Sequence, residues 1–205
     1  MKILAVSDKV VDWIYSPSIK SQLSGIDLAI GCGDLPLEYL EFINSALDIP
    51  VFYVQGNHSP PEQKRDWQSG YAQGSISLHG KVINYNGFTF AGIEGSINYN
   101  NGPYQYSQFE MWLHVARLIP GLLLNRLRYG RYLNVFVTHA PAWGLQDQPD
   151  LPHQGIKAFR WLLAHFQPDY HLHGHIHVYR PDTVTETTFG RTTVINAYEY
   201  KQIIL

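Results

Sequence analysis

The sequence predicts a single layered α/β domain that contains two β-sheets. Three observations support this class: short apolar runs alternate with a stretch of helical spacing early in the chain, an Asn-Gly turn separates two strand-like runs near the middle, and residues 183–205 have an antiparallel pattern. The chain has 205 residues, 45% of them hydrophobic and 16% charged, so it can bury a substantial core. No repeat or linker divides it, and we expect one domain over residues 1–205.

The first half of the chain has the pattern of a parallel sheet. Residues 2–7, 27–33 and 50–56 are short apolar runs rich in strand-forming residues. Between the last two, residues 37–47 carry apolar side chains at helical spacing behind Pro36. This order predicts a strand–helix–strand unit. Residues 82–93 then predict an antiparallel hairpin, because Asn86-Gly87 is typical of a two-residue turn.

The second half adds helices and a second group of strands. Residues 107–127 should be mainly helical, with a break at Pro120-Gly121. The apolar run 133–139 predicts a buried strand, and a helix should follow over about 156–166. Residues 169–175 predict a strand that runs into a turn, and residues 183–205 predict two or three antiparallel strands around Phe189-Gly190.

Charge and composition exclude several classes of protein. The formal net charge is −2, which gives no general electrostatic footprint for a nucleic-acid polymer or an anionic membrane. No apolar run approaches the ~20 residues of a membrane span, and the apolar run at the N-terminus is too short for a signal peptide. Cys32 is a single cysteine, which agrees with a reducing compartment. We therefore expect a cytoplasmic protein without a membrane partner.

Polar side chains follow the predicted strands at the point where each strand ends, where α/β proteins usually place functional groups. They carry oxygen or imidazole atoms that bind divalent metals: Asp8, Asp34, Asn57, His58, His139, His175 and His177. One tetrahedral zinc takes at most four ligands, so this surplus indicates two metals that share a carboxylate. Two metals in turn favour hydrolysis of a phosphate ester. The alternative is that these residues are polar only because turns favour polar residues.

The order and wording of these groups resemble a known family. Asp8 follows the first strand, Gly33-Asp34 and the GNH sequence at 56–58 come next, then His139 in VTHAP, and finally GHIH at 174–177. In this the chain is similar to the calcineurin-like metallophosphoesterases, whose centre is dinuclear as in purple acid phosphatases. The resemblance implies a four-layer αββα sandwich of two mixed β-sheets flanked by helices, with two divalent or mixed-valence ions of manganese, iron or zinc.

The resemblance also implies a role for each residue. Asp34 would bridge the metals, with Asp8 and His177 on the first and Asn57, His139 and His175 on the second. A metal-bridging hydroxide would attack the phosphorus of a phosphomono- or phosphodiester. His58 would not be a ligand but would act as the general acid.

The chain departs from the family pattern at Val10. The first motif is normally Asp-x-His, whereas this chain has Asp8-Lys9-Val10. The first metal should therefore have one protein ligand fewer and bind more weakly. In an extended chain Val10 would point to the same side as Asp8. The alternative interpretation is a catalytically silent binding module on the same fold.

Two residues are candidates for substrate contacts. His153 lies in the loop after VTHAP, and Tyr104 lies in a Tyr/Asn-rich run at 97–109 that could form a rim and stack on a substrate group. The alternatives are solvent exposure for His153 and a partner-facing patch for the run. The substrate should be a small phosphate ester.

Further histidines and arginines have less specific interpretations. His171 and His173 alternate with His175 and could extend the metal site, but buried hydrogen-bonded histidines are the commoner case. Four arginines between 117 and 131 could receive an anionic substrate or RNA, and a solvated basic helix face is the more frequent finding.

Overall fold

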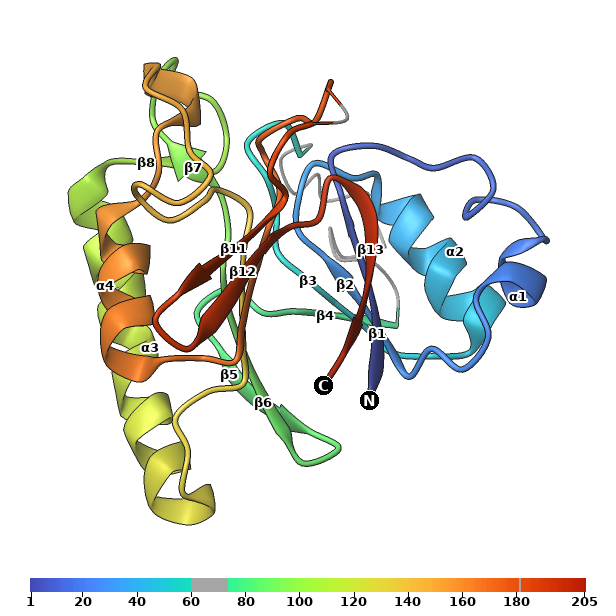
Figure 1. Cartoon of the computed structure of the whole chain (residues 1–205), viewed down its shortest axis with the longest axis horizontal. Coiled ribbons are helices and arrows are strands. Elements are labelled where there is room, and N and C mark those ends of the chain that lie inside the picture. Colours follow the sequence, from blue (N-terminus) through green and yellow to red (C-terminus); the bar gives the residue numbers. More distant parts are fainter. Residues whose placement is uncertain (60–73, 181) are drawn as a thin grey trace, which may run out of the picture.

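The computed structural model describes residues 1–59, 74–180 and 182–205. It has four layers, in which two β-sheets face each other and helices cover the outer face of each sheet (Figure 1). The expected αββα sandwich of mixed sheets is therefore confirmed.

The first sheet is built from the N-terminal half of the chain and closed by the last strand. Its strands, in spatial order, are β13 (Glu199–Ile204), β1 (Lys2–Ser7), β2 (Leu28–Gly31), β3 (Val51–Tyr53) and β4 (Ser75–Ser77). The strands from β1 to β4 are parallel, and β13 is antiparallel to β1. Two helices accompany this sheet, α1 (Ile19–Gln22) and α2 (Leu37–Leu47), and α2 has the bounds that the apolar spacing predicts.

The second sheet holds the remaining long strands. Its spatial order is β11 (Glu186–Phe189), β12 (Thr192–Asn196), β10 (Tyr170–His173), β9 (Val135–Thr138), β6 (Phe88–Ile93) and β5 (Val82–Tyr85). The predicted hairpin joins β5 to β6, and its turn residues Asn86 and Gly87 have φ of 48° and 82°. The β11–β12 hairpin is also antiparallel, but β12 pairs in parallel with β10 and the final strand crosses to the first sheet.

The remaining elements lie on the outer side of the second sheet and at its edge. They are β7 (Ser96–Ile97), β8 (Gln105–Tyr106), α3 (Gln108–Tyr129), the 3-10 turn η1 (Leu151–His153) and α4 (Lys157–Phe166).

In the described parts of the chain, three apolar clusters fill the spaces between the layers. The central cluster joins the inner faces of both sheets through residues such as Ile30 and Phe52 from one and Val137 and Leu172 from the other. A second cluster packs α2 on the first sheet, and a third packs α3 and α4 on the second. Such burial is the main stabilising contribution to folding.

The expected break at Pro120-Gly121 is wrong, because α3 runs without interruption from Gln108 to Tyr129. Proline removes one backbone donor, but Ala116 and Pro120 lie on the exposed side, where water can satisfy the freed carbonyl. Gly121 has a packing role instead, since a Cβ atom there would lie 2.9 Å from the Val82 side chain. Tertiary contact therefore overrides the local helix-ending pattern.

The parallel strands of both sheets end at the same edge of the sandwich, so the residues that follow these strands lie together there. Within the described ranges, no helix is long and apolar enough to cross a membrane.

Candidate metal centre

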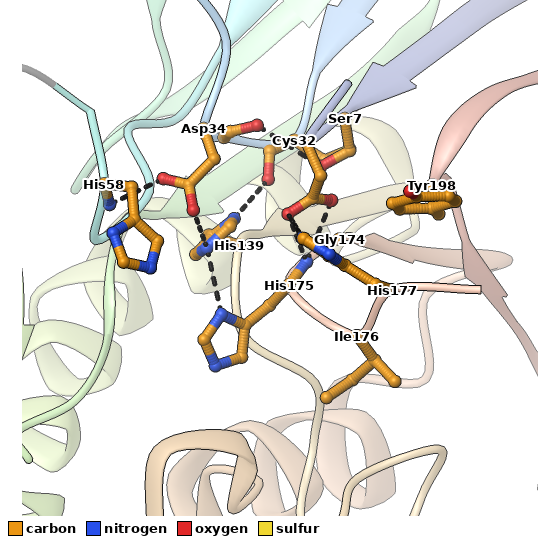
Figure 2. Close-up of polar contacts among 12 residues, drawn as sticks. Ser7, Cys32, Asp34, His58, His139, Gly174, His175, Ile176, His177 and Tyr198 are labelled. Atoms are coloured by element: carbon orange, nitrogen blue, oxygen red, sulfur yellow. Dashed lines mark hydrogen bonds and ion pairs between the residues drawn. The ribbon is translucent and has the colours of Figure 1, made fainter. Parts of the chain in front are cut away.

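Side chains from both sheets converge where the parallel strands end (Figure 2). Asp8 and Asp34 follow β1 and β2, while His139 and His175 come after β9 and β10 of the other sheet. The backbone turns sharply at three of these residues, since Asp8, Asp34 and His175 have φ of 64°, 54° and 67°. Such left-handed conformations are uncommon for residues other than glycine and concentrate at functional sites.

Donor atoms of metal-binding type gather within this group. The ligand atoms of Asp8, Asp34 and His139 lie within 4.8 Å of one another. Three acceptors surround the Nε2 atom of His139: Asn57 Oδ1 at 3.0 Å, His175 Nδ1 at 3.2 Å and Asp34 Oδ2 at 3.3 Å. A single proton on Nε2 can be directed at only one of them.

The outer nitrogens of the two imidazoles face backbone carbonyls. His139 Nδ1 lies 2.9 Å from the carbonyl oxygen of Cys32, and His175 Nε2 lies 2.7 Å from that of Pro152. A carbonyl oxygen can only accept, so both outer nitrogens donate and the lone pairs of the neutral rings point inward. This is the arrangement in which metal-binding histidines are held by a neighbouring carbonyl. The residues present therefore fit a divalent cation between the rings.

The two imidazoles have pKa values shifted in opposite directions. Burial alone would lower the pKa of His139, but the Asp34 carboxylate raises that pKa to about 9. Burial, assisted by the charge on His139, lowers the pKa of His175 to about 3, so its Nδ1 keeps a lone pair. The Asp34 carboxylate thus favours the protonated form of His139, while His175 is held in the neutral form.

The carboxylates have opposite pKa shifts. Burial acts to raise the pKa of Asp34, but the charge and hydrogen bond of His139 and the backbone N–H of His58 hold it well below its ordinary value. Burial raises the pKa of Asp8, although His139 partly offsets this effect. Asp8 accepts the backbone N–H of His175 at 3.0 Å with both oxygens. A cation nearby would favour the ionised form of both groups.

Gly56 leaves room for Asp34. A Cβ atom at Gly56 would lie 2.1 Å from Asp34 Oδ1 and 2.6 Å from Asp34 Cγ. The glycine of the GNH sequence therefore has a steric role in this site.

The side of the site around Asp8 has fewer donors. His177 Nε2 lies 3.8 Å from Asp8 Oδ1, the His177 side chain is 42% exposed, and its Nδ1 shares a hydrogen bond of 2.8 Å with the Tyr179 hydroxyl. The expectation that Val10 points to the same side as Asp8 rested on an extended chain. That premise is wrong, because β1 ends at Ser7 and Asp8 is left-handed.

Both residues after Asp8 have contacts outside the metal-binding group. Val10 packs against the apolar cluster beneath the first sheet. Lys9 forms an ion pair of 2.5 Å with Glu199.

A hollow of about 220 Å³ opens over the group. Its lining residues are Asp34, His58, Gln148, His153, His175, His177 and Tyr179. The backbone N–H of His58 donates to Asp34 Oδ1 at 2.8 Å, which anchors this exposed residue at the wall of the hollow. The His153 ring lies 5.3 Å from that of His175, and its Nδ1 is 2.6 Å from Asp150 Oδ2. His58, predicted as the general acid, and His153, predicted as a substrate contact, thus both line the space in which a ligand would sit.

Gln148 and Tyr179 were not among the predicted site residues, and Tyr99 was predicted only as part of the Tyr/Asn-rich run 97–109. Asn57 donates its amide to the Tyr99 hydroxyl at 3.1 Å, so this tyrosine orients a candidate ligand. The Tyr/Asn-rich composition around residue 99 was the available indication. In the part of the chain that the structure describes, Tyr104 does not line the hollow. It occupies a turn with φ of 51°, where its carbonyl accepts the Ser96 amide.

His171 and His173 have partners outside the metal-binding group. His171 Nε2 lies 2.9 Å from Thr138 Oγ1, and His173 Nε2 lies 2.8 Å from Gln146 Oε1. Both are fully buried, and burial lowers the pKa of each below its ordinary value. They are therefore neutral hydrogen-bonded core residues, as the commoner case predicts.

The fold and these side chains define an α/β sandwich with a candidate metal-binding group at one edge. The sequence model of the calcineurin-like phosphoesterase family matches residues 20–179, and the chain belongs to this family, whose members are generally metal-dependent phosphoesterases. The matched range begins after Asp8 and Val10, so it does not bear on the departure at residue 10. No curated protein sequence matches the chain significantly.

Solved structures share the fold at low sequence identity. The crystal structure of TT1561 from Thermus thermophilus superposes with a TM-score of 0.63 at 17% identity, over 97% of this chain and 89% of the other. Another crystal structure gives 0.64 at 15% identity over 98% and 94%. GAP50, the anchor in the inner membrane complex of Plasmodium, gives 0.53 at 12% identity over 96% and 70%. These similarities concern the fold alone.

Proposed function

We propose that the protein is a metal-dependent phosphoesterase that hydrolyses a small phosphomono- or phosphodiester. The observation that carries this proposal is the pair of inward-facing imidazole nitrogens of His139 and His175, 3.2 Å apart, with an oxygen of Asp34 and one of Asn57 beside them. Family membership adds the reaction class. In this proposal Asp34, Asn57, His139 and His175 hold one cation, and Asp8, Asp34 and His177 hold a second.

Two divalent cations of manganese, iron or zinc, when bound, would activate a water molecule and neutralise charge on the phosphate. The chain's own residues supply the remaining functions. Asp34 and Asp8 compensate the positive charge from a buried position, and the carbonyls behind His139 and His175 keep their rings oriented.

His58 is proposed to give a proton to the leaving oxygen. Its backbone is tied to Asp34 while its side chain lines the hollow, so the ring is placed beside a bound substrate. Imidazole is the most frequent proton donor near neutral pH. Mutation of this residue should therefore affect the reaction rate more than metal binding.

Substrate selection would come from the walls of the hollow. Asp150 orients His153 on one side, and the segment around Tyr99, which holds the Asn57 amide, would form a rim. A volume of about 220 Å³ suits a small phosphate ester rather than a polymer. A cytoplasmic location is part of the same proposal, and the buried free thiol of Cys32 agrees with it.

One observation favours a second candidate, a binding module without catalysis. The side of the site around Asp8 has the partly exposed His177, with Val10 packed on an apolar cluster. If that side holds no cation, the fold could bind a phosphate group without cleaving the ester.

Activity of the metal-stripped and manganese-loaded protein separates the two candidates. Wild type and His165→Ala, a matched exposed histidine outside the site, should hydrolyse bis(p-nitrophenyl) phosphate or p-nitrophenyl phosphate only with metal. His139→Ala should be inactive. Absence of hydrolysis by loaded wild type would favour the binding module, and full activity of His139→Ala would contradict the proposed site.

A further inference from the structure

Helix α3 carries an apolar stripe on its outward face along its whole length. The residues recur at spacings of three and four, which places them on one side of a helix. They are Phe109, Trp112, Leu113, Ala116, Pro120, Leu123, Leu124 and Leu127, here called the α3 stripe. All are exposed, and Phe109 and Leu127 at its two ends are 70% and 84% exposed. Figure 1 shows that α3 lies on the outer surface of the sandwich, beside α4.

The fold uses little of this stripe. Trp112 packs edge-to-face on Trp161 of α4, with ring centroids 5.6 Å apart, and keeps 37% of its surface exposed. The opposite side of the helix holds α3 on the second sheet through Met111, Val115, Leu118 and Leu122, all of which are buried. The α3 stripe therefore exposes a continuous apolar face in addition to the one that folding requires. A contiguous apolar face of this kind marks a binding surface.

The α3 stripe is symmetric in sequence about Leu118. Two antiparallel copies of α3, aligned at this residue, bring each stripe residue opposite another apolar stripe residue. The pairs are Phe109 with Leu127, Trp112 with Leu124, Leu113 with Leu123, and Ala116 with Pro120. Large side chains meet at the ends and small ones at the centre, which lets the two helices approach closely. A self-complementary surface is what a twofold dimer needs.

The charges beside the stripe fit the same arrangement. At 100° per residue, Glu110 and Arg128 fall on the same flank of the helix, eight residues before and ten residues after Leu118. In the antiparallel pair they lie on the same side, about 3 Å apart along the axis. Such a pair of helices would contain two Glu–Arg pairs, in which each Glu110 carboxylate would also keep its hydrogen bonds from Ser107. Arg117, one residue from the centre, meets its own copy near the twofold axis, and this like-charge pair opposes association.

We propose that two copies of this chain associate through antiparallel packing of their α3 stripes. The stripe lies outside the residues of the metal centre, so the proposal is independent of the proposed activity. A 22-residue helix is about 33 Å long, and one helix pair belongs to the small class of interfaces. Association in the micromolar range is therefore expected.

Sedimentation velocity at protein concentrations below, within and above the micromolar range tests the proposal. Wild type should shift from monomer to dimer, and Leu127→Asp should raise the dimer dissociation constant about tenfold or more, because the change occurs twice in each interface. Val184→Asp, at a 65% exposed apolar residue outside the stripe, is the matched control and should behave as wild type. Arg117→Gln should tighten the dimer because it removes the like-charge pair.

A cross-linking experiment tests the register without relying on stability. The native Cys32 is buried, so Ala116→Cys adds an accessible thiol close to the proposed axis, and Val184→Cys adds one away from it. A short bis-maleimide should link two copies of the Ala116→Cys protein efficiently and leave the Val184→Cys protein monomeric. Equal cross-linking of both variants would contradict this pairing.

Other occupants of the stripe would give distinct results. A wild-type protein that stays monomeric at every concentration would overturn the proposal. If that monomer bound vesicles of anionic phospholipid and Leu127→Asp did not, the stripe would be a membrane-binding face, with Arg126 and Arg128 as its basic flanks. Weaker association of Arg117→Gln would exclude the antiparallel alignment at Leu118.

Discussion

Replacement of Gly56 by alanine should disable the metal centre while the fold persists. The added Cβ atom would lie 2.1 Å from Asp34 Oδ1, whereas ordinary van der Waals contact begins at 3.4 Å. Asp34 would have to move by about 1 Å, and a displacement of that size at a catalytic group can reduce the rate roughly 10²-fold. The backbone hydrogen bond from His58 to Asp34 would be lost as well, which weakens metal affinity about 10- to 100-fold.

The effect on stability should be moderate by comparison. Overpacking typically costs about 1–3 kcal/mol, and no positive φ at Gly56 adds backbone strain. The assay is the manganese dependence of phosphodiester hydrolysis, followed alongside thermal unfolding. Gly56→Ala should need more manganese for half-maximal activity and should not regain wild-type turnover at saturation.

Two glycine variants separate the steric effect from loss of stability. Gly102→Ala places its Cβ 2.8 Å from the flexible amide end of Gln105, so it should change little. Gly121→Ala presses on Val82 beneath α3 and should lower stability without changing the metal requirement. Wild-type turnover and manganese dependence in Gly56→Ala would refute the steric argument. An equal loss of turnover in Gly121→Ala would show that the effect of Gly56→Ala comes from lower stability.

Three further predictions concern the proton donor, the metals and acid stability. His58→Ala should lower turnover roughly 10²–10⁴-fold with unchanged metal content. The loss of turnover should be smaller for nitrophenyl esters, because their leaving group needs no proton. Loss of metal in this variant would show that His58 is a ligand. Manganese titration of the stripped protein should show two unequal affinities, because the Asp8 side has fewer donors; two equal sites would contradict this. Burial lowers the pKa of His79 to about 4, below the unfolded value of 6.5, so the folded state binds fewer protons between these values. The contribution of His79 to the free energy of unfolding should be complete above pH 6.5 and should fall towards pH 4 by at most about 3 kcal/mol. Urea unfolding of His79→Gln should show a smaller fall in stability over this range. An equal fall in the variant would show that His79 does not cause the loss.

The strand ends were predictable because they depend on local sequence and a general rule of α/β folds. Each buried apolar run finishes before a donor residue, and parallel strands bring those donors to one edge. Asp34, Asn57, His139 and His175 therefore meet as the pattern indicates. Their chemical roles remain predictions.

The features that were missed depend on contacts between distant segments. Pro120 is tolerated in α3 because its side of the helix faces solvent, which sequence spacing alone did not show. The orientation of Val10 depends on the left-handed turn at Asp8. Gln148 and Tyr179 reach the hollow from loops, whose paths have no periodic pattern in sequence.

The most direct test of the metal centre is anomalous diffraction from crystals of the protein grown with manganese. We expect a strong anomalous peak bonded to His139 Nε2 and His175 Nδ1 at roughly 2.0–2.3 Å, with oxygens of Asp34 and Asn57 completing the site. A second, weaker peak should lie beside Asp8. A crystal with manganese in solution but no peak between the two imidazoles, or with the metal bound elsewhere, would contradict the assignment.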